Sequence, residues 1–95
     1  MPRNDKIIAR IEKFNDKRGG GIVVEHRRGG YTLVLEVTCA PIARLKPTGD
    51  DDRMRVLYWS HRDRWADPTP IGSVILPLDE ALEYIAGEPV FWIWA

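Results

Sequence analysis

The sequence contains a single cysteine, Cys39, among its 95 residues. One thiol cannot form an intramolecular disulfide, and it excludes every zinc site that is built from several thiolates. The chain also lacks an apolar run of the roughly 18 to 20 residues needed to cross a bilayer, and its first residues lack the apolar stretch of a secretory signal. We therefore expect a cytoplasmic protein that works in a reducing compartment without a membrane partner.

Basic residues are absent from the last third of the chain. Residues 1–30 carry eight lysines or arginines against four acidic residues, residues 31–65 carry six against five, and residues 66–95 carry none against five. The net charge of zero argues against a dedicated, electrostatically driven nucleic-acid binder. The asymmetry predicts that the acidic C-terminal segment packs beside the basic N-terminal segment of the same chain or of a neighbour, with modest stabilisation.

The length and the hydrophobic pattern predict one domain over residues 1–95, because a chain of this size supplies one core. Apolar residues recur at helical spacing in two segments, and β-branched runs lie between them. The pair Gly29-Gly30 predicts a tight hairpin turn. The expected elements are a helix over about 5–17, a hairpin over 22–38, strands over 40–46 and 53–60, and a helix over 76–89.

This order of elements, α-β-β-β-β-α, predicts an α+β fold. Because each connection is short, we expect a four-stranded antiparallel meander sheet flanked by an N-terminal and a C-terminal helix. The chain ends in the apolar tail VFWIWA, residues 90–95. Such a tail is unfavourable in water, so we expect it under a helix, paired as an edge strand, or buried in a dimer.

The segment LYWSHRDRWADP, residues 57–68, contains residue types that occur in catalytic sites. Ser60 and His61 are adjacent in an expected strand and point to opposite faces, and no G-x-S-x-G elbow presents the serine. The HRD triplet is that of kinase catalytic loops, but Pro68 stands where the metal-binding asparagine belongs. We therefore expect a non-enzymatic protein without catalytic residues, and a small enzyme that uses Cys39 or His61 is the weakest alternative.

A metal site could combine His26, His61 and Cys39 with a carboxylate only if the fold brought them together. No pair of these residues has the short spacing of a local site. The three aspartates at 50–52 lack the alternation and the closing glutamate of a calcium loop. We expect neither a metal nor another cofactor.

Arginines near aromatic residues favour a second alternative, the binding of single-stranded nucleic acid on the sheet. Side chains two residues apart in a strand share a face, and arginines with aromatic neighbours can grip phosphates and stack on bases. Nearby acidic residues and the zero net charge place this alternative second. The basic residues expected on such a face are Arg44, Lys46, Arg53 and Arg55.

Four tryptophans in a chain of this size favour an interaction surface as the leading hypothesis. Interfaces are rich in tryptophan, tyrosine and arginine, which cover a large area and keep a polar handle. We expect a non-enzymatic module that binds a protein partner or forms a homodimer through an aromatic patch. The residues expected in this patch are Trp59, Arg62, Asp63, Trp65, Phe91, Trp92 and Trp94.

Several short motifs give the chain a family resemblance. They are PIAR at 41–44, LYW at 57–59, RDRW at 62–65, the leucine-rich acidic helix and FW at 91–92. In this order, over roughly residues 31–94, the chain resembles the short bacterial proteins of the domain-of-unknown-function 3024 family. The resemblance implies a small α+β bacterial domain, and it implies no activity because the family has no established function to transfer.

Overall fold

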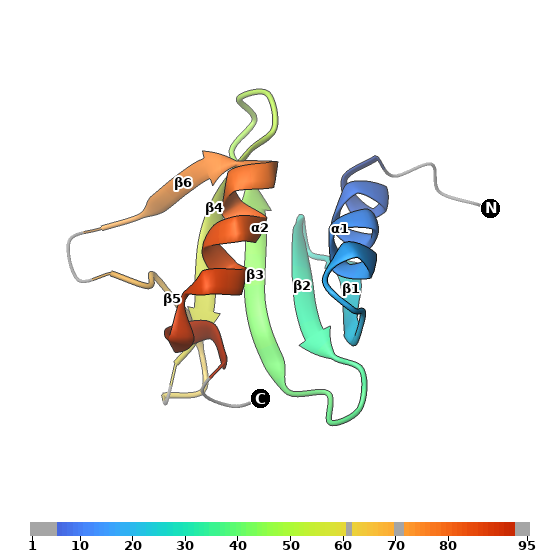
Figure 1. Ribbon diagram of the computed structural model, residues 1–95. Coiled ribbons are helices and arrows are strands. Elements are labelled where there is room, and N and C mark those ends of the chain that lie inside the picture. Colours follow the sequence, from blue (N-terminus) through green and yellow to red (C-terminus); the bar gives the residue numbers. More distant parts are fainter. Residues whose placement is uncertain (1–5, 61, 70–71, 93–95) are drawn as a thin grey trace.

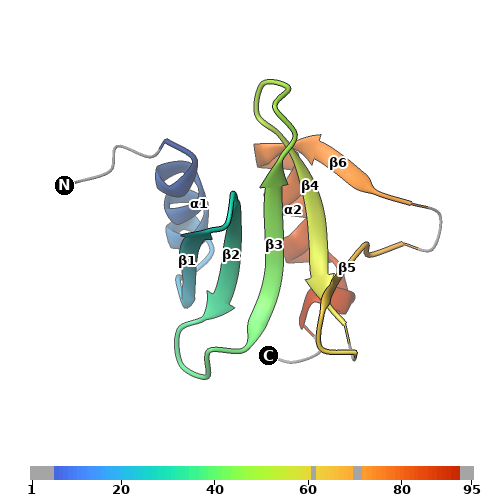
Figure 2. The ribbon, with the colours of Figure 1, turned by 180° about the vertical axis from the view of Figure 1, so that it is seen from behind.

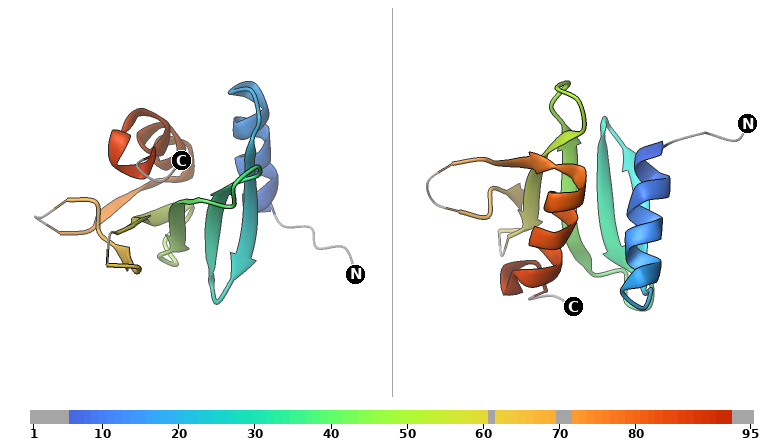
Figure 3. Two further views of the ribbon diagram at one scale, coloured as in Figure 1. Left: turned by 90° about the horizontal axis from the view of Figure 1, so that it is seen from below. Right: turned by 45° about the horizontal axis from the view of Figure 1, so that its top comes forward.

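The structure, a computed structural model, describes residues 6–60, 62–69 and 72–92. In these ranges an antiparallel sheet of six strands carries both α-helices on one face (Figures 1 and 3). None of the described helices has the length and apolar character needed to cross a membrane. The elements are α1 (Lys6–Lys17), β1 (Ile22–Arg27), β2 (Gly30–Leu35), β3 (Pro41–Pro47), β4 (Arg53–Trp59), β5 (Trp65–Ala66), β6 (Val74–Pro77), α2 (Leu78–Gly87) and the 3-10 helix η1 (Pro89–Trp92).

The sheet runs in the order β1-β2-β3-β4, and β4 then pairs with two short strands. β6 lies beside the first part of β4, where Met54 is opposite Leu76, and β5 lies beside its end, where Trp59 is opposite Trp65. The predicted α+β class and antiparallel sheet are confirmed, whereas the prediction of four strands is wrong. With two and four residues, β5 and β6 are too short to show an alternating pattern in the sequence.

The hairpin of β1 and β2 forms as predicted, but its turn lies one residue earlier. Arg28 (φ 51°) and Gly29 (φ 77°) occupy the two left-handed positions of the turn. Gly30 instead begins β2 opposite Arg27 and is buried. A Cβ atom at Gly30 would lie 2.7 Å from Nη2 of Arg44, so the missing side chain makes room for that guanidinium.

The core lies between the sheet and the two helices. Four residues of α2 are buried, spaced so that they share one helix face, whereas the buried residue of α1 is Ile11. A register shift between β2 and β3 at Leu33 and Val34 lets two consecutive residues, Ile42 and Ala43, both be buried. The largest side chains that are fully buried are Phe91, Ile42, Leu45, Met54, Leu78 and Val56.

The C-terminal segment turns back under α2 as η1. Phe91 is only 1% exposed and its ring packs edge-on against Tyr84, with the centroids 5.5 Å apart. The indole Nε1 of Trp92 donates a hydrogen bond to the carbonyl of Ile85 at 2.9 Å. Of the placements expected for the apolar tail, burial against a helix of the same chain is therefore the one observed for residues 90–92, and Trp94 lies outside the described residues.

Ion pairs join the basic N-terminal helix to the acidic C-terminal helix, as the charge asymmetry predicts. Nη2 of Arg10 lies 3.0 Å from Asp79 on α2 and 3.1 Å from Asp52 in the β3–β4 loop. The hydrogen bond to Asp79 is the largest cause that raises the pKa of Arg10. Directly after α1, Arg18 pairs with Glu83 of α2. These contacts hold the two helices side by side on the sheet (Figure 3).

Candidate functional site

The sheet face opposite the two helices is covered by no described helix (Figure 2). We call it the open face. The cross-strand register, together with alternation along each strand, determines which side chains stand on it. These residues are Val23, Glu25, Arg27, Thr32, Val34, Arg44, Lys46, Arg53, Arg55, Leu57, Trp59, Trp65 and Ile75.

The open face is basic although the whole chain has no net charge. It carries five lysines or arginines, against Glu25 on β1 and Asp67 just after β5. All four members of the predicted basic set are among the five, so the fold brings that set together on one surface. Within the predicted set of four, Lys46 and Arg53 are exposed, and the only ionic contact described for Arg53 is a long one of 3.9 Å to Asp50.

Arg44 is held in place by the β1–β2 hairpin. Its Nη1 donates to Oγ1 of Thr32 at 2.6 Å, and its Nη2 donates to the carbonyl of Arg27 at 2.7 Å. The guanidinium thus lies over Gly30, where no side chain obstructs it. A cation that is anchored in this way keeps its charge at a defined position on the open face.

Arg55 makes a forked ion pair with Asp67. Its Nε donates to Oδ1 at 3.1 Å and its Nη2 donates to Oδ2 at 2.9 Å, and both side chains are part-buried. The hydrogen bond to the carboxylate is the main cause that raises the pKa of Arg55. This pair links the centre of β4 to the chain after β5 and fixes the edge of the open face.

Trp59 and Trp65 form an aromatic pair at one end of the open face. They are opposite each other in the β4–β5 ladder, and their ring centroids lie 5.0 Å apart with the planes at 71°. Both indoles are half-buried. Leu57, two residues before Trp59 on the same face, is only 7% exposed although no described helix lies over it.

The predicted aromatic patch does not form one surface in the described residues. Trp59 and Trp65 lie on the open face, whereas Phe91 is in the core and Trp92 is on the helix side of the sheet. Arg62 and Asp63 are exposed in the turn after β4, where Oγ of Ser60 accepts the backbone N–H of Arg62 at 3.2 Å. A strand end and a C-terminal helical turn on opposite sides of a sheet cannot share a binding surface.

Candidate catalytic and metal-binding residues are spread over the fold. His26 stacks on Tyr31 near the hairpin turn, whereas Cys39 is exposed in the turn at the opposite end of β2. Ser60 is buried, and His61 lies outside the described residues. Within the described ranges no three histidine, cysteine or acidic side chains cluster as metal ligands would.

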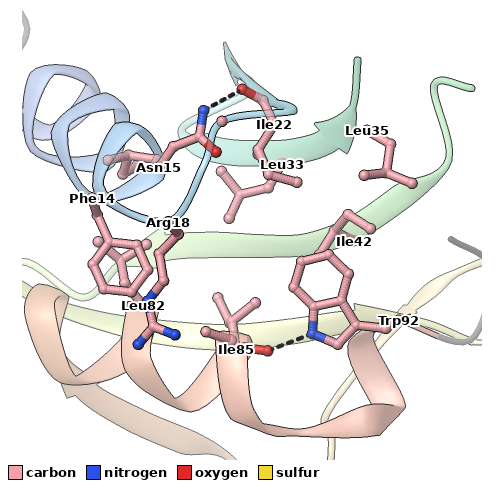
Figure 4. Close-up of a pocket in the computed structure, with 13 residues that line it drawn as sticks. Phe14, Asn15, Arg18, Ile22, Leu33, Leu35, Ile42, Leu82, Ile85 and Trp92 are labelled. Atoms are coloured by element: carbon pink, nitrogen blue, oxygen red, sulfur yellow. Dashed lines mark hydrogen bonds between the residues drawn. The ribbon is translucent and has the colours of Figure 1, made fainter. Parts of the chain in front are cut away.

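The helix side of the sheet contains a groove that the sequence analysis missed. It lies between α1 and α2 over β2 and β3, and one part of it is a cavity of about 360 Å³ (Figure 4). Phe14 of α1 and Arg18, the residue after α1, face Leu82 and Ile85 of α2 across it. The helical residues fit ordinary amphipathic helices and Arg18 fits an ordinary helix end, so no local signal in the sequence indicates a cavity.

Comparison with known proteins adds no assignment: no protein-family model, curated protein or solved structure matches this chain significantly.

Proposed function

We propose that this protein is a non-enzymatic binding module that holds single-stranded nucleic acid on the open face. The observation that supports this function best is that the four predicted basic residues and the Trp59–Trp65 pair occupy one sheet face, over which no described helix lies. Cations along such a face can contact phosphates, while half-buried indoles offer rings on which unpaired bases stack. From Arg53 to Trp59 the face extends for roughly 20 Å along β4.

The charge of the open face favours an anionic partner over a second copy of the chain. Two open faces packed against each other would bring Lys46 and Arg53 close to basic residues of the other copy, and such like-charge contacts oppose association. The aromatic patch expected for a homodimer also has less support, because Phe91 is only 1% exposed. The proposed function is thus the second of the two binding functions expected from the sequence.

Tryptophan fluorescence during titration with oligothymidylate and oligouridylate tests the proposal. We expect quenching at low salt that weakens as the salt concentration rises. Lys46→Gln combined with Arg53→Gln should lower the slope of log K against log salt by about 1.4, since each phosphate contact on a single strand contributes about 0.7. Trp65→Leu should weaken binding about tenfold through lost stacking.

The matched control is Lys13→Gln combined with Lys17→Gln, two exposed cations of α1 on the other side of the sheet. This variant removes the same charge and should leave the salt slope unchanged. Equal losses in both double variants would mean that the contact is not made by the open face. Absence of quenching by either oligonucleotide at low salt would rule out the nucleic-acid function.

Light scattering over a wide concentration range tests the protein-partner hypothesis in the same samples. A dimer that dissociates in the Trp65→Leu variant would replace the proposed function with self-association through the aromatic pair. Membership of the domain-of-unknown-function 3024 family and a cytoplasmic location remain predictions, and neither contributes to this proposal.

A further inference from the structure

The groove between α1 and α2 has two adjoining parts of different chemistry. The apolar chamber is the cavity of about 360 Å³, and most of its wall is hydrocarbon from Leu33, Ile42, Leu82, Ile85, Ala86 and Trp92. The charged chamber, of about 410 Å³, is lined mainly by ionic side chains of α1 and α2. Phe14 and Arg18 line both chambers, so the two chambers adjoin at these side chains.

The charged chamber has an excess of positive charge. Among the described residues that line it, the cations are Arg10, Lys13, Lys17 and Arg18, and the anions are Asp79 and Glu83. An apolar group in the first chamber is therefore next to a cationic region. This combination complements a molecule with a hydrocarbon chain at one end and a negative group at the other.

Arg18 stands at the border between the chambers. Its guanidinium lies 5.1 Å from the centre of the Phe14 ring and pairs with Glu83. The side chains of Arg18 and Glu83 are 51% and 63% exposed, so this ion pair is weak and a second carboxylate can compete with Glu83 for it. Arginine suits this exchange because its planar fork of donors matches a carboxylate.

We propose that this groove binds a free, medium-chain alkyl carboxylate as a monomer. The alkyl chain occupies the apolar chamber, and the carboxylate binds at Arg18. The cavity lies within the range of about 300 to 1,000 Å³ that is usual for small-molecule sites, and such sites combine apolar walls with a few placed polar groups. The site is on the helix side of the sheet and does not depend on the function proposed for the open face.

Calorimetric titration of the full chain with decanoate, below its micellar concentration, tests the proposal. Decanol and decyltrimethylammonium, which have the same chain with a neutral or a cationic head, are the comparison ligands. We expect decanoate to bind most tightly and the cationic ligand least tightly. In NMR spectra, decanoate should shift the methyl signals of Leu33, Ile42 and Ile85, which line the apolar chamber.

Charge variants identify the head-group contact. Arg18→Gln should weaken decanoate binding about fivefold and leave decanol unchanged, because only the carboxylate loses a partner. Glu83→Gln should tighten decanoate binding, since it removes the competing carboxylate. Arg62→Gln, which removes one exposed positive charge in the turn after β4, is the matched control and should change neither ligand.

Ala86→Leu tests the part of the site that holds the alkyl chain of the ligand, because the larger side chain fills the apolar chamber. It should abolish binding of decanoate and decanol together, with circular dichroism unchanged. If this variant does not fold, the Arg18→Gln and Glu83→Gln pair still decides the proposal, because their expected effects on decanoate have opposite signs.

Four results would overturn the proposal. One is the absence of both heat and methyl shifts with decanoate at millimolar concentration. A second is decanoate binding that equals decanol binding and is insensitive to Arg18→Gln. A third is binding that appears only after residues 93–95 are removed, which would assign the groove to the end of the chain itself. The fourth is binding to anionic phospholipid vesicles without binding to monomeric decanoate.

Discussion

The forked contact between Arg55 and Asp67 fastens the chain after β5 to the centre of β4, with N–O distances of 3.1 and 2.9 Å. Strand β5 has only two residues and therefore few backbone hydrogen bonds to β4. The Arg55–Asp67 pair helps to hold this segment against β4. A double-mutant cycle with Arg55→Gln and Asp67→Asn should give a coupling of about 0.5 to 1 kcal/mol in the free energy of unfolding.

Arg53 and Asp50 provide the internal control for that cycle. Their closest N–O distance is 3.9 Å and both side chains are at least half exposed, so the same substitutions at this pair should give no measurable coupling. Urea unfolding measures all the variants. Equal coupling in the two cycles would mean that the forked geometry adds nothing.

Replacing Phe91 by alanine should lower the free energy of unfolding by about 3 to 5 kcal/mol, because a fully buried aromatic side chain is lost and a cavity remains. Val37→Ala, at a position 91% exposed, should stay within about 0.5 kcal/mol of the parent protein. Urea denaturation monitored by circular dichroism checks both values. If Phe91→Ala instead leaves the free energy of unfolding nearly unchanged and abolishes self-association, Phe91 belongs to an interface and not to the core.

Raising the pH should destabilise the protein through Tyr84. Burial, and secondarily the charge of Glu88, raises the pKa of this phenol above its ordinary value of 10.0. The folded state therefore favours the neutral phenol, and its contribution to stability is complete below pH 10 and is lost as the pH rises through the folded-state pKa. Thermal unfolding from pH 8 to 11 should show this loss in the parent protein and a smaller loss in Tyr84→Phe, which has no phenol at this position.

Gly30→Ala tests whether the absence of a side chain at position 30 stabilises the protein by making room for Arg44. The new Cβ displaces the guanidinium and breaks its hydrogen bonds to Arg27 and Thr32, at an expected cost of about 1 kcal/mol. In an Arg44→Ala background the same change should be neutral or slightly stabilising, because alanine is less costly than glycine in a strand.

Gly29→Ala separates packing from backbone strain in this test. Gly29 has a φ of 77° and no atom near its missing Cβ. Its substitution should cost about 1 to 2 kcal/mol in both backgrounds, since the strain comes from the left-handed backbone and not from Arg44. Unfolding midpoints of the four combinations measure the difference; a background-independent effect at Gly30 would contradict the packing explanation.

Elements with a clear period were predictable from the sequence. The helix expected over about 5–17 is observed as Lys6–Lys17, and the strand expected over 53–60 is observed as Arg53–Trp59. The formation of each element depends on the spacing of apolar side chains within its own segment. The strands β5 and β6 were missed because two to four residues carry no period, and they form only where β4 offers free backbone groups on its outer edge.

The candidate site was predictable only in part. Alternation along β3 and β4 was sufficient to group the basic residues, because residues two apart in a strand share a face whatever the fold. Trp59 and Trp92, which the predicted aromatic patch groups together, lie on opposite sides of the sheet, because local patterns do not determine on which side of a sheet the returning chain lies. The groove was not predictable from local patterns either, because its walls come from helices at opposite ends of the sequence.

The sequence alone determined the α+β class, the positions of the main helices and strands, and the attraction between a basic beginning and an acidic end, since these follow from composition and short-range periodicity. The tertiary structure decided which residues face each other: it placed Trp59 and Trp65 with the basic residues, buried Phe91, and left a cavity between α1 and α2. Such placements depend on packing between distant segments, which is determined by the whole core and by no single stretch of the chain.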